Sequence, residues 1–496
     1  MANCEKTREI GREGKSRFKP TMKFPQIIQG GMGAGVSGWR LVHAVSSRGH
    51  IGVVSGIALD LILARRLQLG DPGGHMQRAL AAFPDQSVSR RIIDRYYIAG
   101  GKPSDQPFAA KPVVGDKLSR KLEEMLVAAN FAEVFLAKEG HDGMVGINYL
   151  NEIQAPLLPS LYGAMLAGVD IVIVGAGIPV EIPKILDGLF RCETVDLKLH
   201  VREVESGHAH RISFNPKNMF AGACPPLRHP LFFPIVSSVT LANLLVKRCE
   251  GQVDGFIIEG PSAGGHNAPP RGHTKLSPEG EPVYGPRDVI DLAAIESLGR
   301  PFWLAGSYGS PKKLAHALAV GAAGIQAGTI FAFCEESGIR EDLKRDVIKG
   351  CQGGTMRIFT DPVASPTGFP FKVLAIPGTL SDSDLYAKRR RQCDLGYLRE
   401  VYERPDGTLG WRCPAEDPEQ YVRKGGTIDD TVGRKCLCNG LMANIGMAQT
   451  RSDNTEELPL VTCGDDLSGI LQVLSSGKIS YTAADVVDFL LACNET

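Results

Sequence analysis

FWLAGSYGSPKKLAHALAVGAAGIQAGTIF, residues 302–331, contains two short apolar runs that each end in small residues. About twenty residues separate the two ends, which is the spacing of adjacent parallel strands joined by a helix. A single glycine here would indicate only a tight turn, but two glycine sites in register indicate amides that converge on one anion. The Ser-Pro pair at 310–311 starts a helix whose N-terminus favours that anion. The residues predicted to bind a phosphate are Gly306, Ser307, Tyr308, Gly309, Gly328 and Thr329.

Strand-like runs followed by amphipathic helical stretches recur on both sides of this segment, and eight such runs can be counted. Eight parallel strands close a barrel, so the sequence predicts an α/β fold of the (β/α)8 TIM-barrel type. The predicted strands are residues 26–31, 51–56, 144–150, 170–177, 231–238, 253–260, 301–307 and 323–329.

The gaps between the strands are uneven, and the long gaps indicate insertions. Residues 57–140 contain helical patterns, and 178–230 contain a predicted hairpin between the fourth and fifth strands. The barrel pattern stops near residue 345. We therefore predict a barrel over residues 1–345 and a C-terminal, cysteine-containing appendage over 346–496.

The composition fits an ordinary enzyme with a large core, since 43% of the 496 residues are hydrophobic and 22% are charged. Lys plus Arg equals Asp plus Glu at 55 each, which removes the electrostatic argument for a nucleic acid or an anionic membrane as partner. A small-molecule substrate is expected, and an oligomer is compatible with the sequence.

Two features predict a cytoplasmic protein. Residues 1–20 are polar and mixed in charge, unlike a signal peptide, and no later stretch approaches the roughly 20 apolar residues of a membrane span. The 12 cysteines are too dilute for a disulfide scaffold, so we expect thiols. Cys224 and Cys334 are expected to pack in the core or in a pocket wall.

The segment from Trp303 to Phe331 resembles the FMN-phosphate region of the nitronate monooxygenase (2-nitropropane dioxygenase) family, which is related to FMN-dependent trans-acting enoyl reductases. QGGMGAGVSGWRLVHAVSSRGHIGVVSG, residues 29–56, looks like the first strand, helix and second strand of that family. The similarity spans roughly residues 24–335 and implies FMN as the cofactor. It also implies that Gln29, Gly30, Gly31 and Met32 line the isoalloxazine pocket and that Asn148 bonds to the polar edge of the ring.

EGPSAGGHNAPPRGH, residues 259–273, follows the sixth strand and resembles the Glu-Ala-Gly-Gly-His signature of the family, with Gly-Pro-Ser between Glu259 and Ala263. The resemblance places Glu259, Gly264 and Gly265 at the flavin. It makes His266 the catalytic residue, as a general base or as a hydrogen-bond donor to a substrate anion. Without that context, a histidine beside glycines is more often a surface or capping residue.

One further arginine and three further histidines are not predicted to be catalytic. Arg271 and His273 share the loop of His266 and are explained equally well by substrate contact or by solvation. His208 and His210 lie in the predicted hairpin turn and are expected to be structural or exposed.

Four cysteines of the tail, Cys393, Cys413, Cys436 and Cys438, lie in polar segments with little apolar content. Four thiolates can bind a structural zinc or an iron–sulfur cluster. However, no pair has the common two-residue gap, so ordinary buried or free thiols are the favoured interpretation and a metal site is the alternative.

Three functions fit these observations. The first is a nitronate monooxygenase-like reaction, in which an alkyl nitronate or a similar carbon acid is oxidised with oxygen as acceptor. The second is an NAD(P)H-dependent trans-acting enoyl reductase of fatty-acid or polyketide type, for which the basic segment 388–392 would be a docking site for a carrier protein unless it is a solvated face. No Rossmann fingerprint is present, although barrel flavoenzymes can bind nicotinamide over the flavin. The third is a non-catalytic flavin sensor.

Overall fold

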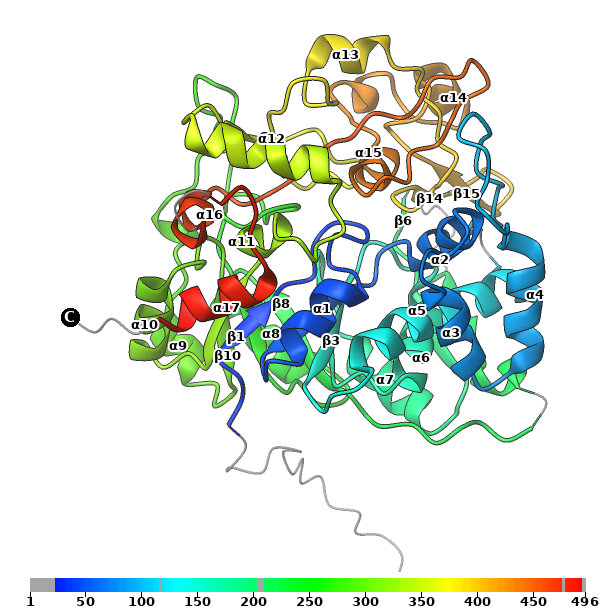
Figure 1. The fold of residues 1–496 in the computed structure, drawn as a ribbon, viewed down its shortest axis with the longest axis horizontal. Helices are drawn as coiled ribbons and strands as arrows, with labels where there is room; N and C mark the ends of the chain where they lie inside the picture. Colours follow the sequence, from blue (N-terminus) through cyan, green and yellow to red (C-terminus); the bar gives the residue numbers. More distant parts are fainter. Residues whose placement is uncertain (1–22, 116, 203–208, 221, 475–477, 493–496) are drawn as a thin grey trace, which may run out of the picture.

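Eight parallel strands close into a barrel in the order β1-β11-β10-β9-β8-β4-β3-β2, which confirms the predicted fold and all eight predicted strands (Figure 1). The computed structural model describes residues 23–115, 117–202, 209–220, 222–474 and 478–492. The N-terminal segment 1–20, used above for the cellular location, lies outside them. The strands are β1 Ile27–Gln29, β2 Ile51–Ser55, β3 Val145–Leu150, β4 Ile171–Gly175, β8 Leu231–Val236, β9 Phe256–Glu259, β10 Phe302–Ala305 and β11 Gly324–Ala327.

Branched and aromatic side chains fill the barrel interior at its amino-terminal end. Trp303 stacks on Phe233 with ring centroids 5.1 Å apart, and Phe24 meets the Trp303 ring edge-on at 5.4 Å. The indole nitrogen of Trp303 donates to the carbonyl of Pro25, so this buried donor is satisfied. The aromatic plug closes the amino-terminal end of the barrel and leaves the carboxyl ends of the strands for a ligand.

Helices surround the barrel, and four of them, α2 to α5, occupy the insertion between β2 and β3. Residues 120–138 form the predicted long helix of this insertion. The α-helices of the barrel and its first insertion are α1 Trp39–Ser46, α2 Leu59–Gln68, α3 His75–Ala82, α4 Gln86–Tyr96, α5 Arg120–Lys138, α6 Leu157–Leu166, α7 Ile182–Phe190, α8 Val239–Arg248, α9 Leu292–Glu296, α10 Pro311–Ala319 and α11 Thr329–Ala332.

The second insertion contains the predicted hairpin, β5 Val195–Lys198 paired with β7 Arg211–Phe214, while part of its turn lies outside the described residues. A disulfide between Cys192 and Cys224 closes the base of this insertion. The expectation of a free, packed thiol at Cys224 is therefore wrong. Its partner is 32 residues away in the chain, a separation from which no pairing can be read.

The tail covers the carboxyl end of the barrel and then returns to its side. It contains the antiparallel pair β12 Ile358–Asp361 and β13 Phe371–Leu374, and a three-stranded sheet of β14 Glu400–Glu403, β15 Leu409–Arg412 and β6 Val201–Arg202. Its helices are α12 Glu341–Gln352, α13 Ser383–Lys388, α14 Pro418–Arg423, α15 Leu437–Asn444, α16 Ser468–Val473 and α17 Ala483–Leu491. Short 3-10 turns lie at Pro216–Met219, Pro286–Asp288 and Asp429–Thr431.

The last helix, α17, packs against α1 and α10, at the place in the ring that the helix following the eighth strand of a TIM barrel occupies (Figure 1). Arg48 beside α1 pairs with Asp488 of α17, and the hydroxyl of Tyr481 donates to the carbonyl of Ile330 at 2.8 Å. Residues 333–482 thus lie between the eighth strand and its helix. The division at residue 345 stays a prediction.

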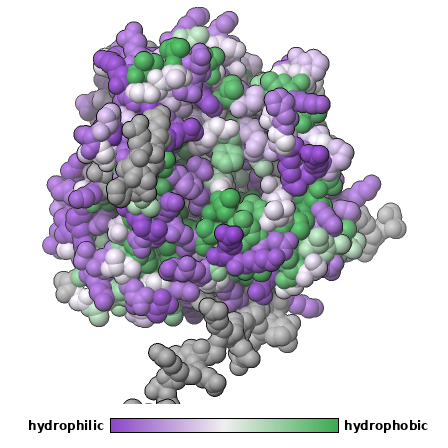
Figure 2. Space-filling model, turned by 180° about the vertical axis from the view of Figure 1, so that it is seen from behind, coloured by the Kyte–Doolittle hydropathy of each residue, from purple (hydrophilic) through white to green (hydrophobic). Residues whose placement is uncertain are grey.

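The surface opposite the view of Figure 1 is largely hydrophilic, with apolar side chains gathered near its centre (Figure 2). No helix among the described residues combines the length and the apolar character needed to cross a membrane.

Candidate active site

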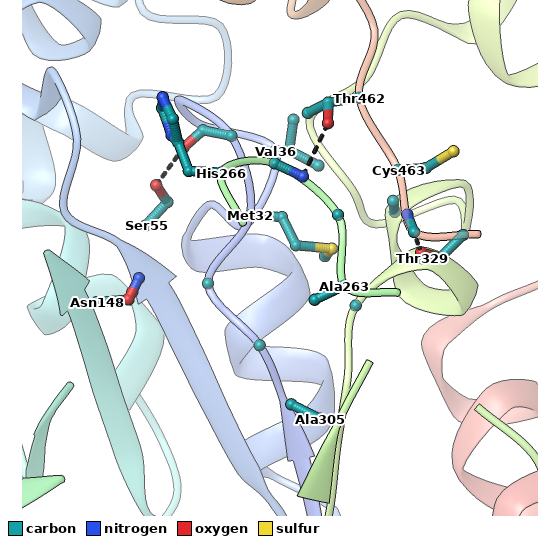
Figure 3. A pocket seen from close by; sticks show the side chains of 18 of the residues that line it. Met32, Val36, Ser55, Asn148, Ala263, His266, Ala305, Thr329, Thr462 and Cys463 are labelled. Carbon is teal, nitrogen blue, oxygen red and sulfur yellow. Dashed lines mark hydrogen bonds between the residues drawn. The ribbon is translucent and has the colours of Figure 1, made fainter. Parts of the chain in front are cut away.

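A cavity of about 260 Å³ opens at the carboxyl ends of the barrel strands and extends under the tail (Figure 3). The structure brings together at this cavity residues that are far apart in the sequence and that the resemblance assigned to FMN or to catalysis. Those that line it are Gly30, Gly31, Met32, Asn148, Glu259, Gly264, Gly265, His266, Gly306, Ser307, Tyr308, Gly309, Gly328 and Thr329.

Gln29 is the member of the predicted set that does not line the cavity. Its side chain is fully buried, donates to Ser37 Oγ at 2.9 Å and accepts from the amide of Val53 at 3.3 Å. The alternation of a strand explains the difference, because Gln29 is the last residue of β1 and Gly30 begins the turn that faces the cavity. Gln29 holds the turn in place rather than contacting the cavity.

The turn after β10 is shaped as an anion cradle. Gly306 has φ +90°, and a Cβ there would lie 3.0 Å from Ser262 Oγ and 3.2 Å from the amide nitrogen of Ala263. Ser307 adopts φ +56°, and its hydroxyl is buried without a hydrogen-bond partner among the described residues. Ser310 caps the following helix α10, and Pro311 occupies its first turn. This geometry leaves amides and a hydroxyl for a bound phosphate.

Thr329, at the second glycine site, has a partner that the sequence did not reveal. Its Oγ1 accepts a hydrogen bond of 2.8 Å from the amide of Gly464 in the tail. The hydroxyl proton of Thr329 stays free for an anion, since the bond to Gly464 uses only an oxygen lone pair. The tail therefore positions one of the predicted phosphate ligands.

Asn148, at the end of β3, has a buried Oδ1 without a partner in the described part of the chain. Gly31 approaches this side chain so closely that a Cβ at Gly31 would lie 2.6 Å from the Cβ of Asn148. A buried acceptor left open beside a bare backbone fits the polar edge of a planar ring such as isoalloxazine. The turn after β10 and Asn148 thus offer one cavity an anion site and a free hydrogen-bond acceptor, which are the kinds of group that FMN needs.

His266 is held by the tail. Its Nε2 lies 2.7 Å from Ser365 Oγ, and its ring meets the Phe371 ring edge-on with centroids 4.9 Å apart. Burial lowers the pKa of His266 from 6.5 to about 4, so the imidazole is neutral at neutral pH. In the part of the chain that the structure describes, Nδ1 has no hydrogen-bond partner and is the nitrogen left for a substrate.

Glu259 ends β9 and lines the same cavity. Burial raises the pKa of this carboxyl from 4.5 to about 8, which makes the protonated form dominant at neutral pH. A neutral carboxyl can donate as well as accept a hydrogen bond. The cavity therefore holds two titratable groups that are both uncharged near pH 7.

Three residues of the tail that could not be found from the sequence lie beside the loop of His266, and Figure 3 shows two of them, Thr462 and Cys463. Thr462 Oγ1 accepts from the amide of Gly265 at 2.9 Å, and Cys463 and Gly464 follow it along the cavity. A Cβ at Gly464 would lie 2.8 Å from the carbonyl oxygen of Ser262. The small residues of this segment were its only signal, and nothing in the sequence paired it with a loop nearly 200 residues earlier.

The predicted metal site is not supported. Among the described residues, no three His, Cys, Asp or Glu side chains are arranged to hold a metal ion. The thiols of Cys393 and Cys413 are hydrogen-bonded to each other, and Cys436 Sγ accepts from Asn439 Nδ2 at 3.5 Å. Cys438 lines the main cavity. The four cysteines nevertheless lie near one another, since Cys393, Cys436 and Cys438 all contribute to the raised pKa of the Cys413 thiol.

The remaining candidates lie outside the cavity. His273 is exposed, and the Arg271 guanidinium donates to the carbonyl of Ser237 at 2.6 Å. His210 contacts Glu403 of the tail at 3.3 Å, whereas His208 lies outside the described residues. In the basic segment 388–392, Arg389 forms a buried ion pair with Glu457, so the segment is only partly a solvated face.

Comparison with known proteins gives one sequence match and several structural ones. Residues 226–356 match the model of a family described as nitronate monooxygenase. No curated protein matches the chain in a sequence search.

Similar solved structures include FabK from Thermotoga maritima, with 15% identity, 94% of this chain and 91% of that chain covered, and a TM-score of 0.44. A nitroalkane oxidase from Streptomyces ansochromogenes shows 14% identity, coverages of 94% and 95%, and a TM-score of 0.45. The enoyl reductase domain of MlnA from Bacillus amyloliquefaciens shows 12% identity, coverages of 94% and 93%, and a TM-score of 0.44.

The family match covers β9, the loop of His266, β10 and the turn after β11, which carry His266 and both glycine-rich turns of the cavity. The sequence resemblance is thus confirmed where it matters for the site: over residues 226–356, this chain carries the sequence pattern of the nitronate monooxygenase family.

Proposed function

We propose that this protein is an FMN-dependent oxidoreductase of the nitronate monooxygenase type, which oxidises an alkyl nitronate or a similar carbon acid with oxygen as the electron acceptor. The observation that carries the proposal is the position of a neutral, buried His266 in one cavity with a phosphate cradle and the unpartnered oxygen of Asn148. The family match over the same loops supports it.

The residues that would hold FMN are divided between two parts of the cavity. The turn of Gly306 to Gly309, with Thr329, would bind the phosphate, and Asn148 with the turn of Gly30 to Met32 would contact the ring. Bound FMN supplies the capacity to accept electrons from the substrate. The protein's task is to orient the substrate and to stabilise its anion.

His266 is suited to both parts of that task. A neutral imidazole can remove a proton from a carbon acid or share a hydrogen bond with a nitronate oxygen. Ser365 holds Nε2, which fixes the plane of the ring and directs Nδ1 to the substrate. The hydroxyl of Ser365 also lies 2.8 Å from Thr367 Oγ1, so the support for the imidazole extends through two residues of the tail.

The first experiment is the absorption spectrum of the purified protein, followed by anaerobic titration with propyl-2-nitronate and, separately, with NADPH. Flavin bands that are bleached by the nitronate and not by NADPH are expected. Bleaching by NADPH alone would instead assign the site to an enoyl reductase. A colourless protein that FMN does not reconstitute would refute the proposal.

The variant His266→Asn tests the role of the histidine. Because the predicted phosphate contacts are elsewhere in the cavity, FMN should stay bound while kcat/KM with the nitronate falls about 100-fold or more, as is usual for loss of a general base. His273→Asn, in the same loop but exposed, is the matched control and should keep wild-type activity. A sensor without catalysis would show no turnover in either form, and equal turnover in the wild type and His266→Asn would remove His266 from the reaction.

A further inference from the structure

Helix α15 of the tail lines the main cavity with one face. Cys438, Leu441 and Asn444 are spaced three residues apart, so they lie on the same side of the helix, and all three line the cavity. The position of this part of the cavity under the tail separates it from the phosphate cradle, which is built by the barrel strand ends.

Asn444 has one satisfied and one unsatisfied polar group. The side chain is 2% exposed, and its Nδ2 donates to the carbonyl of Leu460 at 2.8 Å. That bond orients the amide, because only the nitrogen can donate to a carbonyl. Oδ1 is buried and has no partner among the described residues. An unpaired buried acceptor costs about 1–3 kcal/mol, which a ligand that donates a hydrogen bond would recover.

The side chains around Asn444 are apolar, or their polar groups already have hydrogen-bond or ion-pair partners. Tyr397 and Leu398 line the same cavity, and the Tyr397 hydroxyl donates to Asp60 at 2.7 Å, where Lys111 neutralises the carboxylate at 2.6 Å. Cys438 accepts the backbone amides of Tyr397 and Leu398, and burial raises the pKa of its thiol, which keeps it uncharged. A ligand in this arm therefore meets no free charge.

A second cavity lies beside this arm. It has a volume of about 180 Å³, shares Ile153, Tyr397 and Leu398 with the first cavity, and is lined further out by Trp411 and by charged side chains such as Glu152 and Arg202. The indole nitrogen of Trp411 is buried without a partner among the described residues. Within the first cavity, the apolar side chains of Ile153, Leu398 and Leu441 fit a substrate whose apolar body extends away from the strand ends and under the tail.

We propose that this arm, defined by Ile153, Tyr397, Leu398, Leu441 and Asn444, binds the uncharged apolar body of the substrate, and that Asn444 Oδ1 accepts a hydrogen bond from a donor group on that body. The proposal rests on the function proposed above for the same cavity and specifies its substrate class. Asn444 is a specificity-determining residue in this account and takes no part in the proton or electron steps.

The test measures binding to the FMN-loaded full-length protein, by perturbation of the flavin spectrum and by thermal shift, and so needs no turnover. The probes are straight-chain alcohols from 1-butanol to 1-decanol, each compared with its isomeric methyl ether, such as 1-heptanol with 1-methoxyhexane. The pair has the same atoms, but only the alcohol donates. At the best chain length the wild type should bind the alcohol about fivefold more tightly than the ether.

Two variants separate the donor effect from the apolar arm. Asn444→Leu should abolish the preference for the alcohol without weakening the ether. Leu441→Trp, on the same helix face, should fill the arm and weaken long alcohols about tenfold relative to 1-butanol. Both variants should keep FMN, and the flavin absorbance checks this. If loss of the hydrogen bond to Leu460 unfolds Asn444→Leu, Leu441→Trp still tests whether the arm binds the apolar chain.

Equal binding of alcohol and ether by the wild type at every length would overturn the proposal, as would the absence of any alcohol binding or unchanged long-chain binding by Leu441→Trp. The result is independent of the reaction. Alcohol preference without nitronate oxidation would leave this inference standing and refute the proposed reaction, and nitronate oxidation without alcohol preference would do the reverse.

Discussion

Among single residues, burial in the cavity keeps two titratable side chains, His266 and Glu259, uncharged. His266 and Glu259 would both be ionised in part or in full in water between pH 4.5 and 6.5, yet burial holds each in its neutral form over that range. A neutral imidazole can accept a proton and a neutral carboxyl can donate one, so the cavity holds one group of each kind near pH 7. The same burial makes the stability of the protein depend on pH.

The pH dependence that Glu259 contributes has a definite sign. Its pKa is about 8 in the folded chain and about 4.5 when unfolded, so between these values the folded state binds more protons. Stability is therefore full below pH 4.5 and falls as pH rises towards 8, by about 5 kcal/mol at most. Glu259→Gln should lose this dependence, as measured by urea unfolding at pH 5, 7 and 9. The control is Glu279→Gln, which removes an exposed carboxylate in the loop after β9 and should keep the pH dependence of the wild type. If the free energy of unfolding of Glu259→Gln and of the wild type changed with pH in parallel, Glu259 would not be the group responsible.

At the scale of elements, the hairpin insertion is tied to the barrel by covalent chemistry. The Cys192–Cys224 disulfide joins the end of α7 to the segment that leads into β8, and the two cysteines are 32 residues apart in the chain. Cys192→Ser with Cys224→Ser should lower the free energy of unfolding by about 3 kcal/mol, mainly because the unfolded chain gains freedom. Reduction of the wild type should have the same effect, and reduction of the double variant should have none. Detection of both thiols as free in the unreduced protein would show that the bond does not form.

At the scale of the whole molecule, the tail is part of the barrel's own ring of helices. Val487 of α17 is 1% exposed, whereas Leu491 of the same helix is 41% exposed. Val487→Asp should destabilise the protein by more than about 3 kcal/mol, because it buries a charge between α17 and the barrel. Leu491→Asp, which also introduces a carboxylate but at the exposed last residue of the helix, should alter stability by less than about 0.5 kcal/mol. Equal melting temperatures of the two variants would mean that α17 does not contribute to the fold.

The barrel could be predicted from the sequence because each strand is a local apolar run with its own turn residues. The glycine-rich turns and His266, which the structure brings to one cavity, could be singled out for the same reason, since each lies within one contiguous motif. The contacts of Ser365, Thr462 and Gly464 could not, because they join segments that approach only when the tail folds over the barrel. Likewise, Gln29 and Gly30 are neighbours in the sequence, but Gln29 is buried and Gly30 lines the cavity. Which of the two lines the cavity depends on where the strand β1 ends, and a sequence pattern does not fix that position to one residue.

The position of α17 also has a consequence for synthesis. Translation proceeds from the N-terminus, and the eighth strand of the barrel leaves the ribosome about 160 residues before the helix that completes the ring. At about 5–20 residues per second, the nascent barrel waits roughly ten to thirty seconds with the flanks of α1 and α10 uncovered. During that interval the chain exposes the apolar surface of α1 and α10 that α17 later covers.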